Sequence, residues 1–196
     1  ADSRYVYLSD GGHFENLGLY ELVRRRCALI VAIDASADAG AAFNDLGGAM
    51  RKCFTDFGIE IDIQVKDIEI DPATRLAKSH WAIGEIKYGL VDENCESGLL
   101  LYVKPSLTGN EPADLLNYRN IDHNFPHQST ADQFFDETQF ESYRKLGYHV
   151  GSSILGEICG ELERKMVGNG NRRAALIRLL RRKLKQAQNQ ERLSEE

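Results

Sequence analysis

The chain has 196 residues, of which 42% are hydrophobic, 28% charged and 9% aromatic, as in a folded globular domain and unlike a disordered or fibrous chain. No apolar run approaches the roughly 20 residues that cross a bilayer. The first ten residues, ADSRYVYLSD, lack the basic head and apolar stretch of a signal peptide. We therefore expect this polypeptide to be cytoplasmic or peripheral at a membrane surface.

The formal net charge of −6 is unevenly distributed. From Asn171 to the end there are eight Lys and Arg against three acidic residues, a net of +5, which leaves −11 on the first 170 residues. Nucleic-acid binding requires a basic face, so an acidic body excludes nucleic acid as the main partner. Only the basic tail offers a surface for polyanions, including anionic lipid headgroups.

The cysteines do not form a recognisable metal or redox motif. Cys27, Cys53, Cys95 and Cys159 are widely spaced and include no C-x-x-C pair, which favours neither a zinc cluster nor a redox centre. Four cysteines in a chain of this length are typical of buried thiols in a reducing compartment. We expect no cofactor and no structural metal from these residues.

The N-terminal third predicts a strand, a helix and a second strand. Residues 5–8 (YVYL) are β-prone and end at Asp10-Gly11-Gly12. A short amphipathic helix is expected within NLGLYELVRRR, with its arginines at the C-terminal end. The apolar run 28–33 then predicts a strand that is covered on both faces. Together these elements predict a right-handed βαβ unit in a parallel sheet.

Further elements follow in the middle and at the end of the chain. Residues 44–57 have helical spacing, whereas residues 59–70 alternate as in a half-exposed strand. WAIGEIKYG and LLLYVKP predict strands of an antiparallel extension. After an irregular stretch from residue 106, a long helix is expected within 130–159, with Phe134, Phe135 and Phe140 available for packing. Residues 168–171 then separate a basic amphipathic helix from the body, giving predicted regions 1–167 and 168–196.

The segment Ser9-Asp10-Gly11-Gly12-His13-Phe14-Glu15-Asn16 carries the clearest candidate chemistry. Asp10 would end a strand of a parallel sheet, and such strand ends face the crevice in which ligands bind. The two glycines allow a tight turn that brings main-chain N–H groups to the same crevice. Asp-Gly is also an ordinary turn pair, so spacing alone leaves both readings open.

The stretch YLSDGGHFENLGLYELVRR, followed by an apolar strand, resembles the second half of a patatin-like phospholipase domain. LLLYVKPSLTGNEPADLLNY and FPHQSTADQFFDETQFESYRKLG resemble the downstream part of bacterial members of that family, some of which have membrane-embedded segments. The resemblance runs from about residue 5 to residue 148. It implies a three-layer α/β fold with a mostly parallel sheet, and hydrolysis of a lipid ester by a Ser-Asp dyad. In that dyad Asp10 would be the general base, with Gly11, Gly12 and His13 in the substrate site.

The chain lacks the rest of such a site. No G-x-S-x-G nucleophile elbow and no Gly-rich oxyanion loop is present, and GSSILG from Gly151 has the wrong spacing. In the family both elements precede the D-G-G motif. We therefore expect the chain to be the C-terminal portion of a larger domain, with the upstream half as its partner, and to be inactive alone.

Other polar residues leave alternatives open. Asp34 ends the apolar run 28–33 and could share a metal with Asp10 in a phosphohydrolase, or could cap the turn at Ser36. Glu15, like His13, is expected either to line the pocket or to stabilise the loop. The remaining histidines give weak signals or none: His123 and His127 have helical spacing but flank Pro126, and His80 and His149 show no pattern. A non-catalytic interaction or regulatory module is the rival function.

Overall fold

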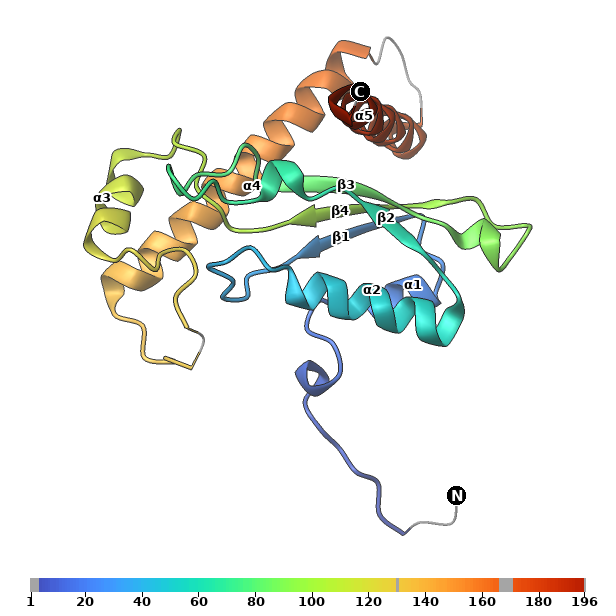
Figure 1. Ribbon diagram of the computed structural model, residues 1–196, viewed down its shortest axis with the longest axis horizontal. Helices are drawn as coiled ribbons and strands as arrows, with labels where there is room; N and C mark the ends of the chain where they lie inside the picture. The colour runs from blue at the N-terminus through green and yellow to red at the C-terminus, as the bar shows by residue number, and fades with distance from the viewer. Residues whose placement is uncertain (1–3, 130, 166–170, 196) are drawn as a thin grey trace.

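The computed structural model describes residues 4–129, 131–165 and 171–195, and shows a mixed sheet between two layers of helices (Figure 1). The sheet has the order β1-β4-β3-β2, with strands Leu29–Ile33 (β1), Ile61–Ile63 (β2), Trp81–Ile86 (β3) and Gly98–Val103 (β4). β1 and β4 are parallel, whereas the pairs β4–β3 and β3–β2 are antiparallel. The α/β class and the antiparallel extension are confirmed, but the prediction of a mostly parallel sheet is wrong.

The two faces of the sheet bury different side chains, because neighbouring residues of a strand point to opposite sides. Ile30 of β1 and Tyr102 of β4 face the layer formed by α1 (Leu19–Arg24) and α2 (Asn44–Phe57). Leu101 of β4 faces the layer that includes α4 (Glu137–Lys165) and α5 (Arg172–Glu195). α3 (Ala113–Ile121) packs at the end of α4. Short 3-10 turns occur at Gly11–His13 (η1), Lys66–Ile68 (η2) and Tyr88–Leu90 (η3).

The prediction of a strand at residues 5–8 is wrong in this structure. The segment belongs to no strand of the sheet, and it leaves the body as an arm on the α1/α2 side (Figure 1). The side chains from Tyr5 to Leu8 are 82–89% exposed. A strand requires a neighbour for its main-chain N–H and C=O groups, and within the described residues no strand lies beside this arm. The expected βαβ unit is therefore not closed.

The second expected strand forms, but only one of its faces is covered. Ile30 and Ala32 of β1 are buried, whereas Val31 is 51% and Ile33 70% exposed. β1 is also the end strand of the sheet, so its outer edge is free of strand partners in the described part of the chain. An apolar groove of about 610 Å³ lies beside this edge, between β1, β4 and α4, and is lined by Val31, Ile33 and Ile154 among others.

Several element boundaries differ from the sequence prediction. The alternating run 59–70 yields only the short strand β2, followed by η2, and the stretch expected to be irregular contains α3. The long helix begins at Glu137, and Phe134 and Phe140, 94% and 62% exposed, do not pack as expected. Phe134 lies in the irregular segment before α4, where no periodicity fixes its side, and Phe140 lies on an exposed side of the first turn of α4.

The basic C-terminal helix packs on the body. Leu179, Leu180 and Leu184 are buried in the same apolar cluster as α4, while Lys183 pairs with Glu157 at 2.8 Å. The expected boundary at 167/168 lies outside the described residues. Among the described residues, no helix is long and apolar enough to cross a membrane.

Candidate functional site

The D-G-G segment forms a tight turn at the base of the arm. Asp10 Oδ1 accepts a hydrogen bond from the Gly12 N–H at 2.8 Å and so caps η1. In the described part of the chain, Asp10 Oδ2 accepts no hydrogen bond, and the residue is exposed. A Cβ on Gly12 would lie 2.7 Å from Asn16 Oδ1, whereas a Cβ on Gly11 would meet nothing within 4 Å. A side chain at position 12 would therefore displace the Asn16 side chain, whereas one at position 11 would enter open space.

Residues just after this turn fasten it to the helical layer. Asn16 Nδ2 donates to Asp45 at 3.3 Å, near the start of α2, and the Phe14 ring meets the Tyr20 ring edge-on. Glu15 accepts hydrogen bonds from the Leu17 and Tyr20 N–H groups at 2.6 and 3.3 Å. Glu15 thus stabilises the loop and the start of α1, one of its two predicted roles. His13 is exposed.

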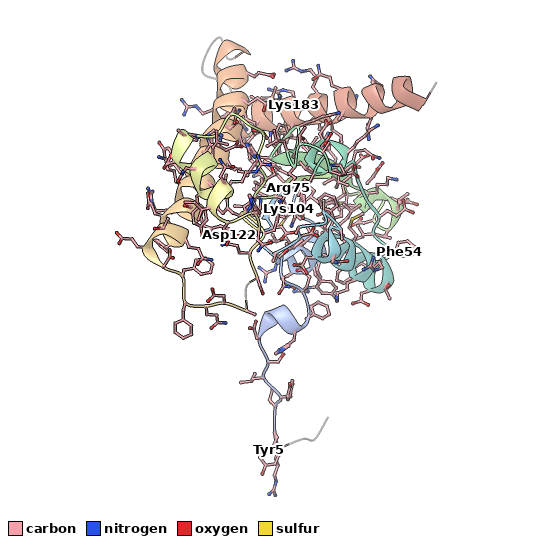
Figure 2. All side chains as sticks on the ribbon, turned by 60° about the vertical axis from the view of Figure 1, so that its left-hand side comes forward. Tyr5, Phe54, Arg75, Lys104, Asp122 and Lys183 are labelled. Atoms are coloured by element: carbon pink, nitrogen blue, oxygen red, sulfur yellow. The ribbon has the colours of Figure 1, made fainter. Side chains whose placement is uncertain are left out.

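A second polar cluster lies where the two parallel strands end. Asp34 follows β1 and Lys104 follows β4, and they pair at 3.1 Å with their side chains 1% and 3% exposed. Asp34 also accepts hydrogen bonds from the Tyr102 hydroxyl and, at 2.6 Å, from Ser36 Oγ. Lys104 lies 3.6 Å from Asp38 as well. Figure 2 shows Lys104 inside the body, far from Tyr5 on the arm.

The charges of this cluster follow from its contacts. Burial raises the pKa of Asp34, but hydrogen bonds from Ser36 and Tyr102 and the charge of Lys104 outweigh it and hold that pKa below its ordinary value. Burial, reinforced by the hydrogen bond to Asp34, raises the pKa of Tyr102. The carboxylate is thus ionised and the phenol neutral. Lys104 pairs with the carboxylate that a metal would need, and among the described residues neither Asp34 nor Asp10 belongs to a group of three neighbouring potential ligands, so the metal alternative gains no support.

His127 borders this cluster and has an unusual environment. Both of its ring nitrogens are buried, and neither has a hydrogen-bond partner in the described part of the chain. Burial, with the nearby charge of Lys104, lowers the pKa of His127 to about 4, although Asp38 and Asp34 act in the opposite direction. His127 is therefore neutral at physiological pH. His123, which shares only a weak helical spacing with His127, is exposed, and its main-chain oxygen accepts a hydrogen bond from Arg75.

We expect His127 to make the protein less stable in mild acid. The unfolded chain takes up a proton near pH 6.5, whereas the folded chain takes it up only near pH 4, so the free energy of unfolding falls as the pH drops between these values. The loss is on the order of 3 kcal/mol at most. Protonation of Asp34, whose pKa is lowered, reduces the free energy of unfolding only at still lower pH. Urea unfolding at pH 7.5 and pH 4.5 measures the difference.

The matched pair for this measurement is His127→Gln and His123→Gln. We expect His127→Gln to flatten the pH dependence and His123→Gln to leave it unchanged. Equal pH dependence in the native chain and in His127→Gln would contradict the assignment.

Possible metal ligands meet at one further place. Among the described residues, the group of three potential ligands with neighbouring donor atoms is His80, Glu111 and His149. No pattern in the sequence indicates this group, because the three residues come from different elements and have no motif spacing. The described thiols of Cys27, Cys53 and Cys95 are free; Cys53 is buried as expected, whereas Cys27 and Cys95 are half-buried. The side chain of Cys159 lies outside the described ones.

Comparison with known proteins does not identify the chain: no family model, no curated protein and no solved structure matches it. The class that the fold defines is a mixed α/β domain with helices on both faces of the sheet.

Proposed function

We propose that this chain is the part of a patatin-like lipid acyl hydrolase that carries the general base, with Asp10 as that base. The observation that supports the proposal best is the fixed D-G-G turn with one carboxylate oxygen of Asp10 unused among the described residues. A carboxylate in this state can accept the proton of a serine hydroxyl as that serine attacks an ester carbonyl. The acyl-enzyme is then hydrolysed by water, with Asp10 again accepting a proton.

The location of the turn also supports the proposal. Asn16 ties the turn to Asp45 near the start of α2, and Phe43, which precedes α2, contacts the Tyr102 ring at 6.4 Å between centroids. Tyr102 is the penultimate residue of β4. The D-G-G turn is thus connected to the carboxyl-terminal edge of the parallel strands, where α/β proteins bind ligands.

The nucleophilic serine would come from the upstream half of the same domain. The exposed edge of β1, the apolar groove beside it and the exposed arm offer the surfaces on which that half would complete the sheet. A phospholipid or another lipid ester is the proposed substrate. Contact of the basic helix α5 with an anionic membrane stays a prediction. The buried leucines of this helix pack against the body.

A serine-directed fluorophosphonate label tests the function. We expect it to modify one serine in a polypeptide that also contains the sequence preceding Ala1, and to leave the 196-residue chain unlabelled and inactive on p-nitrophenyl esters. If the longer polypeptide is neither labelled nor active, the hydrolase proposal is wrong, and a non-catalytic module that uses the groove becomes the better reading. Labelling within the 196 residues would contradict the expected origin of the serine.

The two glycines give a finer test of the turn. We expect Gly12→Ala to lower esterase activity of the longer polypeptide about tenfold, because its Cβ displaces the Asn16 side chain, which fastens the turn that holds Asp10 to Asp45. Gly11→Ala is the matched control and should keep near-normal activity, since its Cβ enters open space. Equal activity in both variants would show that the turn geometry does not position the base.

A further inference from the structure

His80, Glu111 and His149 bring three metal-binding side chains together from distant parts of the chain. His80 directly precedes β3, Glu111 lies just before α3, and His149 is on α4. One donor atom from each residue lies within 4.8 Å of the other two. His80 and Glu111 are 4% and 5% exposed, and the two imidazole rings meet edge-on at 5.8 Å between centroids. This group is separate from the Asp10 turn and does not depend on the proposed hydrolase function.

The hydrogen bonds of His80 leave one of its ring nitrogens available as a ligand. Ser106 Oγ donates to the Ser79 carbonyl at 3.2 Å and lies 3.5 Å from the Lys104 carbonyl. The same hydroxyl oxygen, 3.1 Å from His80 Nδ1, can then accept a hydrogen bond from that nitrogen. In that tautomer Nε2 carries the lone pair, and its contact with Thr108 Oγ1 is long, at 3.4 Å. Burial, more than any other effect, lowers the pKa of His80, which keeps the ring neutral.

His149 is oriented in a similar way. Its Nε2 lies 2.9 Å from Asn110 Oδ1, and an amide oxygen can only accept a hydrogen bond. Nε2 therefore carries a hydrogen, and Nδ1 is the nitrogen left for a metal. Metal-binding histidines typically donate their second ring N–H to an oxygen in this manner, which fixes both tautomer and orientation.

Glu111 supplies a preorganised carboxylate. The Thr108 and Gly109 N–H groups donate to its two oxygens at 2.6 and 2.9 Å. Gly109 has a φ of +90°, a conformation that L side chains rarely adopt, and this directs its N–H to the carboxylate. Burial raises the pKa of Glu111, but these backbone hydrogen bonds outweigh it and keep the pKa below its ordinary value. Oε1 also accepts a hydrogen bond from Thr108 Oγ1 at 3.1 Å, so Oε2 is the oxygen that retains a lone pair for a metal.

We propose that His80, Glu111 and His149 form a Zn²⁺ site. Two imidazoles and one carboxylate are a donor set that zinc uses, whereas Ca²⁺ and Mg²⁺ prefer oxygen ligands alone. Zinc bonds of about 2.0–2.1 Å in a tetrahedron place donor atoms about 3.3 Å apart. The three donor atoms, which lie within 4.8 Å of one another, would therefore move closer together on binding. The fourth position is left to water on the side of the half-buried His149. Such a metal would fasten the start of β3 and the loop before α3 to α4.

Zinc titration of protein freed of metal with a chelator tests the site. We expect one Zn²⁺ per chain by calorimetry, a higher unfolding midpoint with zinc, and the visible absorption of four-coordinate Co²⁺ after cobalt substitution. Trp81, the only tryptophan, directly follows His80, so its fluorescence should be quenched when Co²⁺ binds. A zinc titration that does not saturate at one Zn²⁺ per chain, or the absorption spectrum of octahedral Co²⁺, would overturn the proposal.

Variants separate this site from adventitious binding. His149→Ala removes a ligand that is only half-buried, and should weaken zinc binding about 100-fold or more. Ser106→Ala removes the hydrogen bond that orients His80 and should weaken it about 10–100-fold. The exposed His123→Ala is the control and should bind like the native chain. Equal unfolding midpoints without metal would show that His149→Ala still folds, and equal zinc affinity in His149→Ala and His123→Ala would overturn the site.

Discussion

Replacing Asp10 by Asn is expected to lower the esterase activity of the polypeptide that includes the upstream segment by about 10²–10⁴-fold. Asparagine keeps the shape and can still accept the Gly12 N–H hydrogen bond that caps the turn. It cannot take the proton of a serine hydroxyl at neutral pH. The loss should therefore appear in kcat, with KM changed little, because a lipid ester would bind to the same surfaces.

Asp71→Asn provides the matched control for this result. Asp71 is an exposed carboxylate that also caps a turn, accepting the Ala73 N–H at 2.8 Å, and it lies outside the proposed site. We expect Asp71→Asn to retain full activity. If Asp10→Asn is as active as Asp71→Asn, Asp10 is not the base and the dyad proposal is wrong, even where the serine label has succeeded.

Local periodicity was a good guide to elements that are completed by neighbours in this chain. The helix 44–57, the strands in WAIGEIKYG and LLLYVKP, and the C-terminal helix all appear, because each has an apolar face that meets another element. The strand expected at 5–8 has the right residues but lacks a neighbouring strand in the described part of the chain. The β-prone residues 5–8 indicate a strand that would form beside a neighbouring strand. The free edge of β1 is a surface on which another strand could pair.

Among the polar sites, too, contacts between residues close in sequence could be predicted, whereas contacts between distant residues could not. The D-G-G turn and the bonds from Ser36 to Asp34 depend on residues at most two positions apart, and the sequence indicates both. The pairing of Asp34 with Lys104 depends on the register of β1 and β4, in which Ile33 lies opposite Val103. In the sequence, a charged residue directly follows each of two apolar runs that predict strands. Only the parallel pairing of these strands shows that the two charged residues, Asp34 and Lys104, meet.

The Asp34–Lys104 pair carries the largest expected effect on stability. We expect Lys104→Met to lower the free energy of unfolding by about 3–5 kcal/mol, because methionine occupies a similar volume but leaves the buried Asp34 carboxylate without its countercharge. The Tyr102 and Ser36 hydrogen bonds would remain, but they cannot neutralise the charge. Since domains of this size are stable by about 5–15 kcal/mol, the variant should unfold at much lower urea concentration.

A double variant distinguishes the lost countercharge from lost packing. Asp34→Asn removes the buried negative charge and retains a side chain that can accept from Ser36. We therefore expect Asp34→Asn combined with Lys104→Met to be more stable than Lys104→Met alone, with a coupling energy of about 1–3 kcal/mol. The exposed pair Lys145–Asp114, at 2.5 Å, is the control, and Lys145→Met should change stability by less than about 1 kcal/mol. If the two Lys→Met variants are equally stable, or if the double variant is the least stable of all, the buried pair does not act through its charge, and packing of the Lys104 side chain explains its burial.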